Sequence, residues 1–154
     1  MLQRKEYVKL CGVWLQEDGG WEKNTVELCK KAYSRLSLLT KLKYAETSIE
    51  DLVIIYKSFI RSRLEFCSVA FHSGLTNNQS KSLDRCEAVC LKIILHESYI
   101  SHEAACEMLG LKKLSDRKEE RCKQFAMTSL KHPQNKRIFP LNDENKTCVR
   151  YREP

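Results

Sequence analysis

The segment from Thr47 to Phe71 constrains the fold most, because its apolar residues recur at helical spacing over a long stretch. Thr47 and Glu50 stand three residues apart, which is the spacing of a capping box at a helix N-terminus. The apolar residues that follow recur every three or four positions and therefore share one face of a helix. We predict a buried central helix against which the other amphipathic segments pack. Its apolar face comprises Leu52, Ile55, Tyr56, Phe59, Ile60 and Phe66, and the basic residues that point elsewhere are Lys57, Arg61 and Arg63.

Further segments show helical periodicity, and local signals mark several of their ends. Thr76 and Gln79 form a second capping box, and Ser101 is a favoured N-cap residue. Gly110 suits the position after a helix C-terminus, because glycine adopts positive φ at little cost. The predicted helices cover residues 21–44, 76–95, 101–109 and 115–132.

The N-terminal part differs, because residues 10–15 are apolar and rich in strand formers. Gly12 marks a place where another part of the backbone comes close. A single strand is not stable alone, so we expect either a short hairpin with the first residues or pairing with another protein. Asp18, Gly19 and Gly20 predict a turn after the strand.

Together these segments predict a mainly α protein, a bundle of about five helices with one N-terminal strand or short β-hairpin. We expect three parts along the chain. They are a strand or hairpin over residues 1–20, a helical domain over 21–132 and a loosely ordered polar tail over 133–154.

Composition is typical of a globular protein, since the 154 residues are 42% hydrophobic and 31% charged. No apolar run approaches the roughly 18 residues that a membrane helix requires. The N-terminal sequence MLQRKEYVK is too charged for a secretory signal. We therefore expect an intracellular protein, in the cytoplasm or nucleus, that does not interact with membranes.

The eight cysteines are expected to be reduced, mostly buried thiols. The chain lacks a secretory signal, and most of its cysteines take apolar positions on helical faces. No Cys-x-x-Cys pair occurs, so we expect neither a metal nor another cofactor. A zinc module remains an alternative, and its nearest candidate ligands are Cys90, His96, His102 and Cys106.

The formal net charge of +7 is compatible with nucleic-acid binding, but a solvated positive surface explains it equally well. No local arrangement of Ser, His and Asp, or of Cys and His, indicates a catalytic site. The pattern of residues alone therefore indicates a basic helical module and no enzyme.

Several segments follow one another with particular spacings. They are Leu10-Cys11-Gly12-Val13 with Trp21, then CKKAYSRLSLLTKLKY (29–44), IYKSFIRSRLEFCSVAFHSGLT (55–76), LDRCEAVCLKIIL (83–95), AACEMLGL (104–111) and LSDRKEERC (114–122). In this order and spacing, they resemble the C-terminal part of reverse transcriptases (RNA-directed DNA polymerases) from non-LTR (LINE-type) retrotransposons. The resemblance extends over about residues 7–141.

The resemblance implies that the N-terminal strand closes a polymerase palm and that the helices form the thumb and a following helical region. In that family the catalytic Asp-Asp pair precedes this strand, and this sequence contains no Asp-Asp dipeptide. Polymerase chemistry needs carboxylates that hold two metal ions. The resemblance therefore implies a non-catalytic fragment, with no catalytic residues and no small-molecule substrate.

A thumb holds duplex nucleic acid through its phosphates, which requires Lys and Arg side chains along a helix. The resemblance thus implies an RNA or DNA duplex as partner, bound independently of sequence. Trp14 and Trp21 could stack on bases, but we expect both to lie in the core. The candidate backbone contacts are Lys30, Lys31, Arg35, Lys41, Lys43, Arg61 and Arg63.

A helical protein–protein interaction module without nucleic-acid binding is the alternative function. An N-terminal strand with an unpaired edge would recruit a partner or a second copy of the chain.

Overall fold

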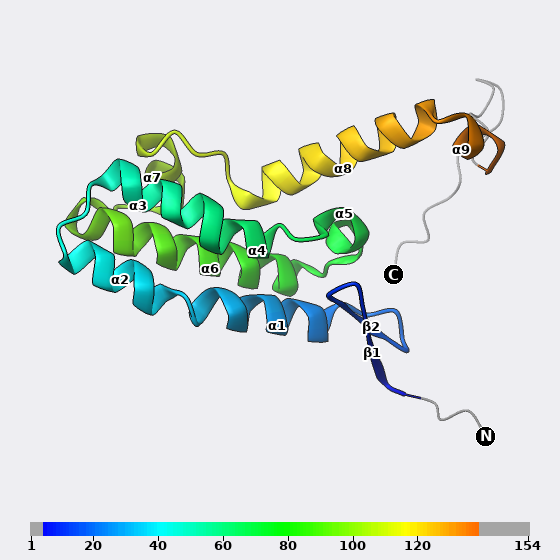
Figure 1. The fold of residues 1–154 in the computed structure, drawn as a ribbon, viewed down its shortest axis with the longest axis horizontal. Helices are drawn as coiled ribbons and strands as arrows, with labels where there is room; N and C mark the ends of the chain where they lie inside the picture. The colour runs from blue at the N-terminus through cyan, green and yellow to red at the C-terminus, as the bar shows by residue number, and fades with distance from the viewer. Residues whose placement is uncertain (1–4, 139–154) are drawn as a thin grey trace. The chain divides into compact units, whose positions relative to one another are not determined.

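Helices make up most of the part of the chain that the computed structural model describes, residues 5–138, and a two-stranded hairpin precedes them (Figure 1). The prediction of a mainly α protein with a short N-terminal hairpin is confirmed. The helices are α1 (Glu22–Tyr33), α2 (Leu36–Tyr44), α3 (Ile49–Ile55), α4 (Ser62–Leu64), α5 (Ser68–Phe71), α6 (Asn77–Leu95), α7 (His102–Met108), α8 (Leu114–Lys131) and α9 (Pro133–Ile138), with a π-helix η1 (Tyr56–Arg61) and two 3-10 turns, η2 (His72–Gly74) and η3 (His96–Ser98).

The chain divides into two compact units, one up to Cys122 and one from Lys123 onwards. The first unit contains the hairpin, α1 to α7 and the first half of α8. The second contains the rest of α8 and α9, where the Asn135 side chain donates to the Ser129 carbonyl oxygen at 3.0 Å. The tail that was predicted to be loosely ordered begins with the helix α9. Pro133, a favoured first helical residue, starts this helix. Residues 139–154 of the predicted tail lie outside the described residues.

The hairpin pairs β1 (Tyr7–Leu10) with β2 (Val13–Gln16) in antiparallel register, with Leu10 opposite Val13. Cys11 and Gly12 form the turn and both have positive φ, at 47° and 90°. Two positive φ values are typical of the type I′ turn, whose twist matches that of the paired strands. The prediction of a continuous strand over residues 10–15 is therefore wrong, since its second and third residues are the turn.

The central segment is interrupted where one helix was predicted. Ser48, not Thr47, is its N-cap and accepts from the Asp51 amide at 3.1 Å. The segment then changes from α-helix to the π-helix η1, and Cys67 ends its regular part with a φ of 52°. A π-helix takes more residues per turn than an α-helix, so it changes which residues face inward. Arg61, predicted to point outward, is buried, whereas Phe59 and Phe66 of the predicted apolar face are exposed.

The predicted helix over residues 21–44 is two helices, α1 and α2, separated at Ser34 and Arg35. The Ser34 hydroxyl donates to the Lys31 carbonyl oxygen at 2.9 Å, and such local bonds compete with helical hydrogen bonding. The buried face of α1 carries Leu28 and Ala32, whereas Val26 and Tyr33, which also recur at helical spacing, are exposed.

Helix α6 is the element that most of the others contact, in place of the central segment predicted for that role. It packs against α1, α2, α3 and α7 (Figure 1). Its capping box of Thr76 and Gln79 is present as predicted, and so are the Ser101 cap of α7 and the positive φ of Gly110. The residues of α6 that recur at helical spacing share its buried face: Leu83, Cys86, Cys90 and Ile94.

Trp21 and Trp14, both predicted to lie in the core, are half-buried, and Trp21 packs against the core at the start of α1. Its ring centroid lies 6.0 Å from that of Phe71. A Cβ atom at Gly74 would lie 2.5 Å from Trp21 Nε1, so only glycine leaves room for the indole there. Among the described residues, no helix is both long enough and apolar enough to span a membrane.

Candidate functional site

A groove of about 460 Å³ separates the central segment from the first turns of α8, and we call it the basic groove. Its side chains come from η1, α4 and the residues just after α4, and from α8. Four of its lining residues are cationic, and one is a carboxylate. The lining residues are Lys57, Arg61, Ser62, Glu65, Phe66, Cys67, Arg117 and Arg121.

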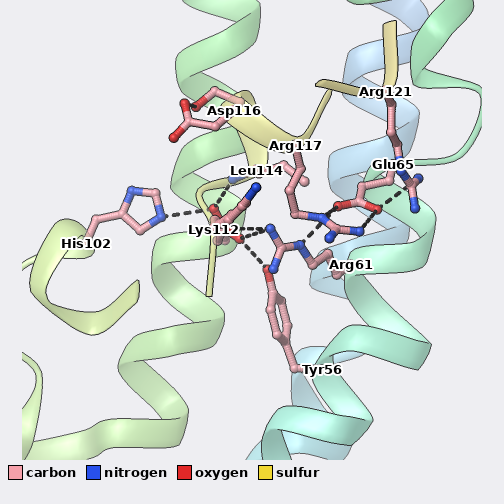
Figure 2. Close-up of polar contacts among 11 residues, drawn as sticks. Tyr56, Arg61, Glu65, His102, Lys112, Leu114, Asp116, Arg117 and Arg121 are labelled. Atoms are coloured by element: carbon pink, nitrogen blue, oxygen red, sulfur yellow. Dashed lines mark hydrogen bonds and ion pairs between the residues drawn. The ribbon is translucent and has the colours of Figure 1, made fainter. Parts of the chain in front are cut away.

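Glu65 lines the basic groove, is buried and binds three arginines (Figure 2). Its Oε1 accepts from Arg61 Nε at 3.1 Å and from Arg117 Nε at 2.6 Å. Its Oε2 accepts from Arg117 Nη2 at 3.1 Å and pairs with Arg121 Nη1 at 2.9 Å. Arg117 therefore makes the two-pronged contact that fixes a guanidinium plane.

Burial and charge act in opposite directions on Glu65, which is 5% exposed. Burial opposes the charged form of the carboxyl group. The hydrogen bond and charge of Arg117, with the charges of Arg121 and Arg61, outweigh that effect and hold the pKa of Glu65 below its ordinary value. Glu65 is thus a carboxylate at neutral pH that positions the arginines around it.

A second buried carboxylate, Glu87 of α6, completes this network. Its Oε1 accepts from the Tyr56 hydroxyl at 2.7 Å and lies 3.7 Å from Arg61 Nη2. Its Oε2 accepts from the Leu114 amide at 2.8 Å and lies 3.1 Å from His102 Nε2. Glu87 therefore ties η1, α6, α7 and the start of α8 together.

Arg61 links the two carboxylates and also donates to the Lys112 carbonyl oxygen (Figure 2). Burial, followed by the charge of Glu87, raises the pKa of Tyr56 well above its ordinary value, so this phenol remains a hydrogen-bond donor. We interpret the buried part of the network as structural, because its carboxylates connect the central segment to the start of α8.

Glu87, His102 and Cys106 form a group whose potential ligand atoms lie within 4.8 Å of one another. The Glu87 oxygens are already occupied by Tyr56, Arg61 and the Leu114 amide, and the guanidinium would compete with a metal ion. The other two residues of the predicted zinc alternative, Cys90 and His96, do not belong to this group. Cys90 is buried in the core and His96 is exposed. We interpret the three residues as part of the structural network.

The basic groove carries a net positive charge at its rim. Side-chain exposure is 36% for Arg117 and 47% for Arg121, and Lys57 is also exposed. A guanidinium has five N–H donors, and the contacts with Glu65 use only one or two on each of these arginines. Fixed, partly unused donors of this kind bind oxyanions such as phosphate.

The residues predicted to contact nucleic acid are not all in one place. Lys30, Lys31 and Lys41 are exposed, Lys43 is half-buried, and Arg63 is exposed. Lys30 pairs with Glu27 at 3.2 Å. None of these five lines the basic groove, although together they make the surface of the first unit more positive.

Arg35 and Arg61 are also predicted contacts, and each has partners in other elements of the protein. Arg35 lies over the exposed ring of Phe59 at 4.3 Å and donates to the Phe59 carbonyl oxygen. Burial and then the nearby Arg63 charge lower the pKa of Arg35. Arg61 is 4% exposed and bound to two carboxylates, so we withdraw it from the candidate contacts.

Sequence reasoning missed the two rim arginines and Glu65. Arg117 and Arg121 are four residues apart, a spacing that places both on one face of α8, and this signal was available. The pairing with Glu65 was not available, since these residues are more than fifty positions apart along the chain. Lys118 was missed as well, and it is 2% exposed with its amine 5.9 Å from the Phe71 ring.

Comparisons with known proteins do not assign this chain to a family, because no family model, no curated protein and no solved structure matches it.

Proposed function

We propose that this chain is a non-catalytic, thumb-like module that binds the sugar-phosphate backbone of a nucleic-acid duplex through the basic groove. The observation that carries the proposal is the pair of exposed guanidinium groups, Arg117 and Arg121, which the buried Glu65 holds in place. The ordered resemblance to LINE-type reverse transcriptases supports the same function, because a thumb grips its template-primer duplex through phosphates.

The geometry suits phosphates better than bases. A carboxylate that orients two arginines reduces the entropy that their side chains lose on binding an anion. Lys57 adds a third exposed cation at the same groove. Contacts to phosphates carry no sequence information, so we expect similar affinity for duplexes of different sequence.

The exposed cations outside the groove have a different role in this proposal. Lys30 and Lys31 of α1 and Lys41 of α2 are exposed and contribute to the overall positive charge. Such charges raise the rate of association with a polyanion without fixing its position.

Replacing Arg121 by Gln tests the groove with little risk to the fold, because Arg61 and Arg117 still pair with Glu65. Loss of one phosphate contact should weaken binding to a short RNA–DNA duplex by roughly five- to tenfold at low salt. Fluorescence anisotropy with a labelled duplex measures this change.

The matched control is Lys92→Gln, which removes one exposed cation of α6 that does not line the groove. It should change the affinity less than twofold, about the level expected of a general charge effect. Equal losses in the two variants, or no binding by the unmodified chain at low salt, would contradict the proposal.

A protein-interaction function is the second candidate, and the hairpin is the observation that favours it. All four residues of β1 are exposed, including Val8 at 49% and Leu10 at 59%. An exposed strand with apolar side chains pairs readily with another strand. Self-association through β1 would appear in sedimentation velocity and would disappear in Val8→Lys, whereas a monomer at high concentration would argue against it.

A further inference from the structure

Among the described residues that line the basic groove, Phe66 alone is aromatic, and the proposed function does not use it. Phe66 is 42% exposed, although its large apolar ring would be more stable away from water. It shares the groove with the exposed guanidinium groups of Arg117 and Arg121. The groove therefore offers a ligand both an apolar ring and hydrogen-bond donors that carry positive charge.

Contacts within the first unit hold the Phe66 side chain in place. A Cβ atom at Gly12 would lie 3.0 Å from Phe66 Cε1 and 3.4 Å from Cζ, so the ring packs against the turn of the β1–β2 hairpin. The Phe66 amide donates to the Arg63 carbonyl oxygen at 3.3 Å, and Cys67 follows with a φ of 52°. A ring that is already positioned loses little conformational entropy when a ligand binds to it.

A positively charged groove with an aromatic side chain is the combination that binds unpaired nucleic acid. The cations follow the phosphates, and the ring stacks on a base. Inside a duplex the bases stack on one another, so a base has a free face only where its strand is unpaired. The volume of the groove, about 460 Å³, suits one small molecule and not the full width of a duplex.

We propose that the basic groove binds a duplex at the point where one of its strands becomes unpaired. The first unpaired base stacks on Phe66, while Arg117 and Arg121 hold the adjoining phosphates. The inference rests on the proposed function, because the same groove binds the duplex. Stacking uses the π face that every base has, so binding remains independent of sequence. Phe66 thus sets a preference for the structure of the nucleic acid and not for its sequence.

Three RNA–DNA duplexes with the same paired sequence test the inference by fluorescence anisotropy. One is blunt, one carries a few unpaired thymidines at the end of one strand, and one carries the same number of abasic residues there. The thymidine overhang should increase the affinity at least about fivefold over the blunt duplex, because one base stacks on the ring. The abasic overhang adds the same phosphates without bases, so its affinity should stay within about twofold of the blunt duplex.

Variants of the full chain assign the preference to Phe66. Phe66→Leu keeps an apolar side chain without a π face, so it should lose the preference for the thymidine overhang and still bind the blunt duplex. Binding of the blunt duplex also shows that the variant is folded. Phe66→Tyr keeps the ring and should keep the preference. The matched control is Tyr44→Leu, which removes an aromatic residue that is 81% exposed and does not line the groove. It should also keep the preference.

The outcomes separate this inference from the proposed function. Equal affinity of the unmodified chain for the blunt and thymidine-tailed duplexes would overturn the inference and leave the proposed function standing. An equal gain from the abasic overhang, or a preference that survives in Phe66→Leu, would do the same. No binding to any of the three duplexes at low salt would contradict the proposed function and, with it, this inference.

Discussion

Glu65 and Glu87 are buried carboxylates, and each is bound by groups from several elements. Removing one charge of such a network leaves the opposite charge buried without its full partner, which costs more than the pair contributes on its own. Arg61 is the residue most affected, because it lies between the two carboxylates. At the scale of single residues, the fold thus depends on charges that solvent does not reach.

Replacing Glu65 by Gln should lower the free energy of unfolding by about 3 kcal/mol at neutral pH, because the shape is kept and the charge is lost. Urea denaturation followed by circular dichroism measures the change. The exposed residue Glu50 gives the matched control, and Glu50→Gln should change stability by less than about 0.5 kcal/mol.

The difference in stability between the wild type and Glu65→Gln should depend on pH. The folded pKa of Glu65 is lower than its unfolded value of about 4.3. Its contribution to stability is therefore fully present above about pH 5, and it is lost as the pH falls through the folded pKa. The difference between wild type and Glu65→Gln should shrink in acid, and a difference that stays constant down to about pH 2 would contradict this account.

The contribution of Lys118 to stability should change with pH in basic solution, where its amine titrates. Burial lowers its pKa to about 8, although Asp84, Glu65, Glu87 and Cys29 favour the charged form. The cost of burying the charge is present below pH 8 and disappears as the pH rises towards the unfolded value of about 10.4. The wild type should gain about 3 kcal/mol relative to Lys118→Met over this range.

Denaturant unfolding of both proteins at several pH values measures that gain. Lys118→Met should be the more stable protein at neutral pH, because it buries no charge. A stability difference between the two proteins that does not change between about pH 7 and 10 would show that the Lys118 amine titrates normally.

At the scale of elements, local signals predicted the ends of helices better than their interiors. The capping box of Thr76 and Gln79 lies within four residues, so the sequence contains the whole interaction. The π-helix η1 cannot be identified in this way, because its hydrogen bonds adjust to tertiary contacts. In η1 those contacts are Arg61 and Tyr56 with Glu87, a residue of another helix.

The hairpin shows a second limit of local reasoning. The turn at Cys11 and Gly12 was not predicted, because it lies within a run of strand-forming residues over 10–15 and cysteine is unusual at positive φ. Asparagine is better suited to that position, and Asn-Gly is the favoured pair for a type I′ turn.

Cys11→Asn should therefore stabilise the chain by about 0.5 to 1 kcal/mol if the hairpin folds together with the bundle. Cys11→Val should destabilise it by a similar or larger amount, because β-branched residues resist positive φ. Thermal unfolding of the two variants measures both effects. The reverse order of stability would mean that the turn is not type I′.

At the scale of the molecule, the sequence predicted a mainly α protein with a basic surface, because periodicity and charge are properties of each segment. It did not predict that α6 would be the most contacted helix or that the cations would be organised around Glu65. Both depend on which distant residues meet, as Glu65 and Arg117 do. The structure therefore favours the basic groove as the candidate contact surface, whereas the sequence favoured α1 and α2.

The salt dependence of duplex binding tests the central claim most directly. The logarithm of the association constant should fall linearly with the logarithm of salt concentration. The double variant Lys57→Gln/Arg121→Gln should reduce that slope by up to about 1.8, since each phosphate contact contributes about 0.9. The control Lys81→Gln/Lys92→Gln has the same net charge and should keep the slope nearly unchanged. Identical slopes for the two variants, or binding that does not respond to salt, would contradict the account.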